Sequence, residues 1–137
     1  MPNSETWLEE FYAAGDALDA KSWIPQYWAE DAELQFAGVP VAKGHAEIEA
    51  FFSARFDELK SMKHTITNVD VLPDKIYHSA TVSYVVKNDP EDRLIQVRAL
   101  TVFGKTPGEN KIRYSHSYMD PTPLIEWKKA VDEQSRQ

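Results

Sequence analysis

The spacing of hydrophobic residues changes once along the chain, from a helical period in about the first sixty residues to alternation afterwards. Apolar side chains return every three or four positions after Ser4, which is placed to cap a helix that runs through Leu18. Ser22 can cap a second short helix, whose first turn tolerates Pro25 because an amide there has no partner to lose. The second helix is expected to run through Trp28, followed by a half-buried strand over residues 32–36 and a third helix over residues 44–59.

Four longer runs of alternating residues follow, separated by short segments rich in Pro, Asn, Asp and Gly. Connections this short join antiparallel neighbours, so the pattern predicts an α+β chain with helices first and a curved sheet after them. The expected strands span roughly residues 63–72, 76–87, 93–104 and 111–120, and a short terminal helix is expected over residues 124–131. We predict one domain over residues 1–137, with its core at about 4–122 and a C-terminal tail at 123–137.

Composition narrows the classes of function. The chain has 137 residues, of which 42% are hydrophobic, enough to bury one core without disulfides. It contains no Cys, which excludes thiolate zinc sites and thiol nucleophiles. The formal net charge of −7 argues against nucleic-acid binding, because phosphate contacts need a basic surface. No apolar run approaches the roughly 20 residues of a membrane span, so we expect no membrane association and a cytoplasmic protein.

Short motifs near the predicted corners add a family resemblance. The motifs are Asp19-x-x-x-Trp23, Trp28-Ala29-Glu30-Asp31-Ala32 and Gly44-His45-Ala46-Glu47-Ile48. With them the chain resembles the nuclear-transport-factor-two-like superfamily, in particular its SnoaL-like branch. The resemblance implies a cone-shaped α+β barrel, with helices packed on a curved mixed or antiparallel sheet around a pocket. This fold carries isomerases, dehydratases, cyclases, epoxide hydrolases and non-catalytic binders, so fold alone does not give the reaction.

The catalytic positions of known relatives are only partly filled here. The positions that carry Tyr and Asp in ketosteroid isomerases correspond to Phe11, Phe36 and Ala99, which lack the required groups. The closing-strand Asp of limonene epoxide hydrolase corresponds to Ser117. The resemblance therefore excludes steroid-isomerase chemistry and leaves the epoxide hydrolase set incomplete.

The partial likeness to scytalone dehydratase points to two residues. Its corner Asp and its strand His correspond to Asp19 and His64, although its second His falls near Val86. A neutral His can accept or donate a proton near pH 7, so His64 is a candidate for proton transfer, and the alternative is a structural, hydrogen-bonded His. Asp19 either orients His64 or fixes the helix corner through nearby backbone amides. Tyr84 offers a hydroxyl that can polarise a carbonyl.

A set of mostly aromatic residues is expected to line the pocket. Hydrophobicity alone would turn Tyr114, His116 and Tyr118 of the last strand inward. The resemblance instead turns Ser117 and Met119 inward, which leaves the first set on an outer face that can form a homodimer interface. The predicted ligand-binding residues are Phe11, Trp23, Trp28, Phe36, Phe52, Phe103, Ser117 and Met119.

Together these features predict a pocket for a small apolar organic ligand, of a polyketide-like or terpenoid-like kind. The leading hypothesis is a cofactor-independent isomerase, dehydratase or cyclase that uses general acid–base catalysis by His64, Asp19 and Tyr84. The alternatives are a non-catalytic ligand-binding module and a dimerisation module whose interior is filled by side chains. The four His are scattered without metal-ligand spacing, so no metal and no cofactor are expected.

Overall fold

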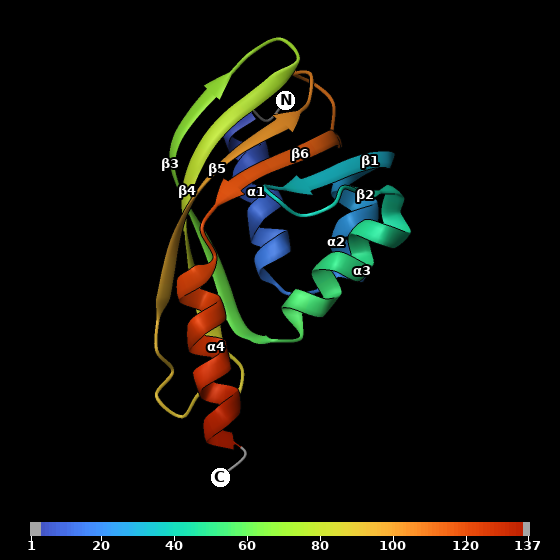
Figure 1. Ribbon diagram of the computed structural model, residues 1–137. Helices are drawn as coiled ribbons and strands as arrows, with labels where there is room; N and C mark the ends of the chain where they lie inside the picture. The colour runs from blue at the N-terminus through green and yellow to red at the C-terminus, as the bar shows by residue number, and fades with distance from the viewer. Residues whose placement is uncertain (1–3, 136–137) are drawn as a thin grey trace.

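Four helices and a six-stranded sheet make up the computed structural model, which describes residues 4–135 (Figure 1). The helices are α1 (Ser4–Asp16), α2 (Ala20–Tyr27), α3 (Gly44–Phe56) and α4 (Thr122–Ser135). The strands are β1 (Trp28–Phe36), β2 (Ala42–Lys43), β3 (Leu59–Val71), β4 (Lys75–Val86), β5 (Ile95–Gly104) and β6 (Ile112–Met119). The α+β class and the helices-first order predicted from the period change are confirmed.

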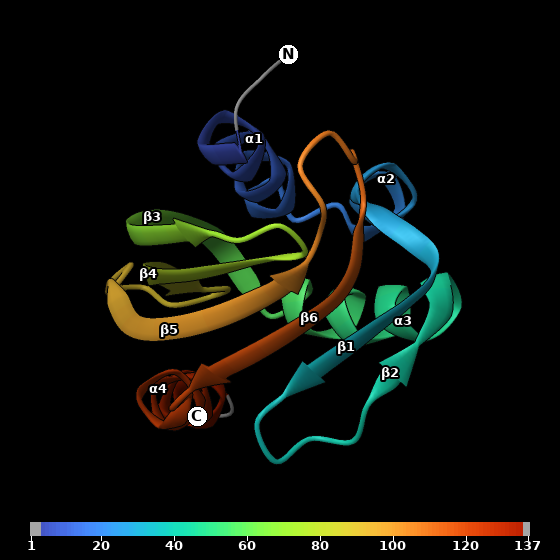
Figure 2. The ribbon, with the colours of Figure 1, turned by 90° about the horizontal axis from the view of Figure 1, so that it is seen from above.

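The sheet is mixed and curved, with the strand order β2-β1-β6-β5-β4-β3 (Figure 2). Strands β3 to β6 pair with their neighbours in antiparallel fashion, as their short connections predict. β1 lies parallel to β6, so the first long strand of the chain pairs with the last. β2 and β3 stay at opposite edges, and the expected barrel is therefore an open curved sheet.

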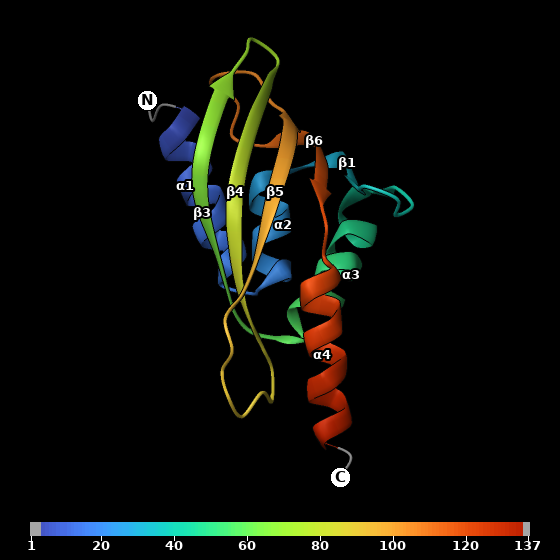
Figure 3. The same ribbon diagram turned by 60° about the vertical axis from the view of Figure 1, so that its left-hand side comes forward.

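Helices α1, α2 and α3 cover the concave side of the sheet, while α4 lies beside the lower ends of β4 and β5 (Figure 3). The core between these layers is largely aromatic. Phe11 is 1% exposed, and its ring centroid lies 4.8 Å from that of Phe103 and 5.1 Å from that of Trp23. Aromatic pairs at such spacings add about 0.5–1.5 kcal/mol each beyond the burial of their area. The helices are thus fixed against the sheet by ring contacts.

The corner between α1 and α2 has a specific backbone geometry. Leu18 takes a positive φ of 61°, which ends α1, and the Asp19 carboxylate then caps α2 by accepting hydrogen bonds from the amide and hydroxyl of Ser22. Just before the corner, a Cβ on Gly15 would lie 2.9 Å from two ring atoms of Trp23. A glycine is required there so that α2 can pack closely on α1.

Several predicted element boundaries are wrong for identifiable reasons. Trp28 begins β1 and pairs with Ile112, but a register shift before Glu33 breaks the alternation that would have marked this strand. Leu59 begins β3, although it continues the helical spacing of Phe56. The short terminal helix expected over residues 124–131 is longer than predicted and forms the 14-residue helix α4, in which Trp127 packs on the sheet. The two-residue strand β2 gave no periodic signal at all.

The last strand faces as the resemblance implies. Ser115, Ser117 and Met119 of β6 lie on the inner face of the sheet, whereas Tyr118 on the outer face is 53% exposed. Its register partner Leu100 on β5 is 49% exposed. The outer face therefore holds an exposed apolar pair.

Candidate active site

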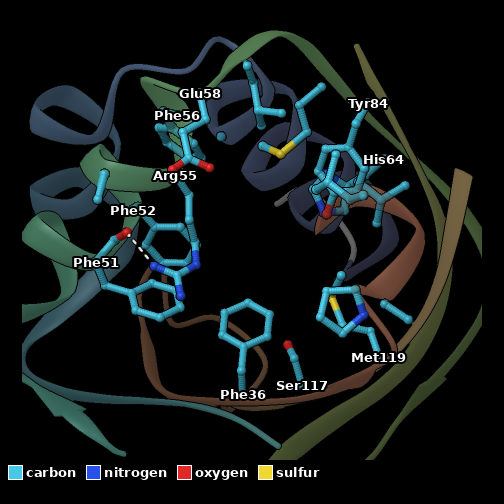
Figure 4. A pocket seen from close by; sticks show the side chains of 18 of the residues that line it. Phe36, Phe51, Phe52, Arg55, Phe56, Glu58, His64, Tyr84, Ser117 and Met119 are labelled. Atoms are coloured by element: carbon cyan, nitrogen blue, oxygen red, sulfur yellow. Dashed lines mark hydrogen bonds between the residues drawn. The ribbon is translucent and has the colours of Figure 1, made fainter. Parts of the chain in front are cut away.

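A cavity of about 770 Å³ lies between the helices and the concave face of the sheet. All eight residues that the sequence suggested for ligand binding line it, namely Phe11, Trp23, Trp28, Phe36, Phe52, Phe103, Ser117 and Met119. Side chains from α3, β1, β3, β4 and β6 surround an open centre (Figure 4). This space contradicts the hypothesis of a dimerisation module with a filled interior.

His64 and Asp16 form a hydrogen-bonded pair on the wall of this cavity. His64 Nδ1 lies 2.6 Å from Asp16 Oδ1, and the His64 backbone N–H donates to Asp16 Oδ2 over 2.8 Å. Each side chain is 16% exposed. Because an ionised carboxylate only accepts hydrogen bonds, Nδ1 must carry the proton in this arrangement. In the neutral imidazole, Nε2 is then the basic nitrogen, and it has no hydrogen-bond partner within residues 4–135.

Tyr12 fixes the plane of the His64 ring. The two rings stack with their centroids 4.2 Å apart and an interplanar angle of 21°. The Tyr12 hydroxyl lies 2.6 Å from His78 Nε2, and burial raises the pKa of Tyr12. Burial also lowers the pKa of His78 to about 4, so this second imidazole stays neutral near pH 7. His78 is 2% exposed on the inner face of β4, so a second imidazole besides His64 points inward.

Tyr84 supplies a neutral hydroxyl on the same side of the cavity as His64 (Figure 4). Burial, together with the negative charge of Asp16, raises the pKa of Tyr84 to about 12. Its hydroxyl accordingly keeps its proton at neutral pH and can donate a hydrogen bond. Within the described chain this oxygen has no side-chain or backbone partner. Further round the wall, Thr101 and Ser117 form a hydroxyl pair with 2.9 Å between their oxygens.

Asp19 does not reach His64, and the expected partnership of these two residues is corrected. The Asp19 carboxylate is occupied by Ser22 at the start of α2, which is the structural role that the sequence left open. Asp16, three residues earlier, takes the place beside His64. A sequence signal for Asp16 existed, because it follows Tyr12 by four residues and so shares its helix face.

Sequence reasoning also missed Arg55, which lines the cavity from the last turn of α3. It follows Phe51 by four positions and Phe52 by three, so a residue facing the cavity was to be expected there. For metals, residues 4–135 contain no cluster of three or more His, Asp or Glu side chains able to hold an ion. Nor does any helix in that part of the chain have the length and apolarity to cross a membrane.

Comparison with known proteins identifies the class. Residues 8–113 match the SnoaL-like domain, and the chain belongs to that family. No curated protein matches the sequence.

Solved structures share the fold at low sequence identity. An NTF2-like protein of unknown function from Burkholderia pseudomallei K96243 aligns with a TM-score of 0.73 and 16% identity, over 92% of this chain and 97% of that one. A protein from Jannaschia sp. CCS1, provisionally named a SnoaL-like polyketide cyclase, aligns with a TM-score of 0.71 and 13% identity, over 87% and 86%. The epoxide hydrolase/cyclase-like enzyme SalBIII, which acts in pyran ring formation in the polyether salinomycin, aligns with a TM-score of 0.70 and 16% identity, over 87% and 92%. At these identities the likeness shows the fold alone.

Proposed function

We propose that this protein is a general acid–base enzyme of the isomerase, dehydratase or cyclase type, acting on a mainly apolar organic molecule held in the cavity. The observation that carries the proposal is the His64–Asp16 pair, whose tautomer leaves Nε2 free as a base beside an aromatic wall. The chain shares its fold with proteins named as a polyketide cyclase and an epoxide hydrolase/cyclase-like enzyme, so the fold can accommodate chemistry of this kind.

The arrangement supports a simple proton-transfer cycle. His64 Nε2 removes a proton from a carbon next to a carbonyl group of the substrate, and the carbonyl oxygen gains negative charge. The Tyr84 hydroxyl, kept protonated by its raised pKa, donates a hydrogen bond to that oxygen. The Asp16 carboxylate stabilises the imidazolium that forms. His64 then returns the proton, either to another carbon, which completes an isomerisation, or to a departing hydroxyl, which completes a dehydration.

Carbon–hydrogen exchange tests this cycle without requiring the natural substrate. Apolar ketones that raise the melting temperature of the protein would be incubated with it in D₂O, and loss of the protons next to the carbonyl would be followed by ¹H NMR. We expect exchange catalysed by the wild type, and a reduction of at least about 10²-fold in His64→Gln, the low end for acid–base residues. Lys63→Gln is the matched control, because Lys63 is exposed on the same strand and lies outside the cavity. Equal exchange rates in wild type and His64→Gln would overturn the proposal.

The second candidate function is non-catalytic ligand binding. It is favoured by the wall itself, in which apolar residues outnumber polar ones, as in sites for drug-sized organic molecules. The same experiment separates the two functions, because ligands that bind tightly but never exchange protons support a binding module.

Homodimer formation through the outer sheet face stays a prediction. Leu100 and Tyr118, register partners on that face, form the exposed apolar pair that a second copy would cover. Sedimentation equilibrium should give twice the chain mass for the wild type and the single mass for Tyr118→Asp. A monomeric wild type at micromolar concentration would contradict the prediction.

A further inference from the structure

A positively charged side chain lies on the wall of the cavity that faces His64. Figure 4 shows Arg55 on one side of the open centre and His64 with Tyr84 on the other. The Arg55 guanidinium carbon sits 3.5 Å from the centroid of the Phe51 ring, and its Nη1 donates to the Phe51 carbonyl oxygen over 3.2 Å. These two contacts hold the guanidinium at the cavity in a defined plane.

The Arg55 guanidinium pairs with no carboxylate. Five ion pairs join side chains within residues 4–135, and Arg55 takes part in none of them. Glu58 lines the same part of the cavity and raises the pKa of Arg55, but burial is the larger effect and lowers it. Lys128, another cavity-lining cation, is already paired with Asp132 at 2.6 Å. Arg55 is therefore an exposed cation at the cavity wall, and no direct partner compensates its charge.

The donors of Arg55 remain available to a bound molecule. A guanidinium has five N–H groups, of which the described chain occupies one. The rest lie in a planar fork that matches the two oxygens of a carboxylate. A neutral ligand group would leave the positive charge and most of the N–H donors of Arg55 without a partner, whereas a carboxylate both neutralises the charge and accepts two parallel hydrogen bonds.

We infer that Arg55 binds a carboxylate of the ligand, so that the cavity takes an apolar organic acid with its carboxylate at Arg55 and its reacting carbon at His64. The second half of this statement rests on the proposed function, while the first half does not. The aromatic wall between the two residues accommodates the hydrocarbon part, and it includes Phe36 and Phe52.

Matched probes isolate the contribution of charge. 2-Naphthoate and 2-naphthamide share one ring system and differ mainly in the charge of the substituent, and their binding would be measured by isothermal titration calorimetry. We expect the wild type to bind 2-naphthoate more tightly than the amide, and Arg55→Gln to weaken 2-naphthoate binding about tenfold, the low end for a charged hydrogen-bonded contact that is partly exposed. The affinity of the amide should not change. The affinity of Arg55→Lys for 2-naphthoate should lie between those of the wild type and Arg55→Gln, because lysine keeps the positive charge but lacks the planar pair of N–H donors.

Two controls make the result specific. Lys63→Gln removes one positive charge outside the cavity and should leave both affinities unchanged. His64→Gln should still bind 2-naphthoate more tightly than 2-naphthamide, so loss of proton exchange and loss of the preference for the acid are separate outcomes. The inference is overturned if the wild type fails to prefer 2-naphthoate, if Arg55→Gln binds it with wild-type affinity, or if Arg55→Gln loses both probes equally.

Discussion

Replacement of Asp16 by Asn tests the hydrogen-bond logic of the site most directly. The wild-type carboxylate accepts two hydrogen bonds from His64, one from its ring and one from its backbone N–H. An amide of the same shape offers one acceptor oxygen and one NH₂ donor. If the oxygen stays with the backbone N–H, the NH₂ group faces Nδ1, which can then pair only as an acceptor. We therefore expect the Asp16→Asn imidazole to move its proton from Nδ1 to Nε2.

The size of the effect follows from the burial of the pair. Both side chains are 16% exposed, so water replaces the lost interaction poorly. Both hydrogen bonds are kept, but each changes from a bond to a charged group, which contributes about 1.5–3 kcal/mol, to a bond between neutral groups, which contributes about 0.5–1.5 kcal/mol. The unfolding free energy should therefore fall by about 2–3 kcal/mol in total. Proton exchange should fall by about 10²-fold or more, because the nitrogen that acts as base is now protonated.

Two measurements check this prediction, and neither needs a substrate. Two-bond ¹H–¹⁵N correlation spectra of protein labelled at its four His report the tautomer of each ring, and the His64 signals are assigned by their absence in His64→Gln. Urea unfolding gives the change in stability from the midpoint at constant m-value. A wild-type His64 protonated at Nε2, or an unchanged tautomer in Asp16→Asn, would refute the reasoning about the base.

Three further predictions concern neighbouring residues. Burial lowers the pKa of His78 to about 4, so between about pH 6.5 and pH 4 the unfolded chain binds a proton at this residue and the folded chain does not. The unfolding free energy therefore has its full value above about pH 6.5 and falls by at most about 3 kcal/mol as the pH drops toward 4. Urea midpoints of His78→Gln should therefore depend less on pH than those of the wild type between pH 6.5 and 4, and parallel curves would contradict this. Tyr84→Phe removes the donor to the developing oxyanion and should reduce proton exchange by about 10²-fold while leaving 2-naphthamide affinity intact. Gly15→Ala should cost about 1–3 kcal/mol of unfolding free energy, because its Cβ would collide with the Trp23 ring, and a wild-type midpoint would show that the ring can move aside.

The sequence predicts the layers of this fold better than it predicts the contacts between them. The change of hydrophobic period near residue 60 separates helices from sheet, and short connections correctly imply antiparallel neighbours for β3 to β6. Periodicity carries no signal for the parallel pairing of β1 and β6, because that pairing joins residues more than eighty positions apart in the chain. The sequence also predicts the wall of the cavity, because aromatic residues that recur at helical spacing lie on one face of each helix and that face points into the interior.

The polar residues of the site were harder to identify because they depend on tertiary contacts. Asp16 and Asp19 are three residues apart near one corner, and only the docking of α1 on β3 decides which of them meets His64. Asp19 is fixed by the nearby Ser22, which a cap pattern can reveal, but Asp16 is selected by a strand 48 residues further along the chain. Arg55 was overlooked because an Arg near the end of a helix ordinarily needs no explanation beyond the helix dipole.

The pairing of β1 with β6 has a consequence for how the chain folds. Until residues 112–119 are synthesised, β1 has only the two-residue β2 beside it, and the aromatic face of α1 to α3 has no complete sheet to pack on. Contacts between such distant segments form slowly, because the long intervening loop must close first. We therefore expect nascent chains that end before residue 112 to be protease-sensitive, and the native fold to form only when the last strand inserts between β1 and β5. The strand that joins β1 to β5 in the cavity wall is thus also the one whose insertion allows the sheet to fold.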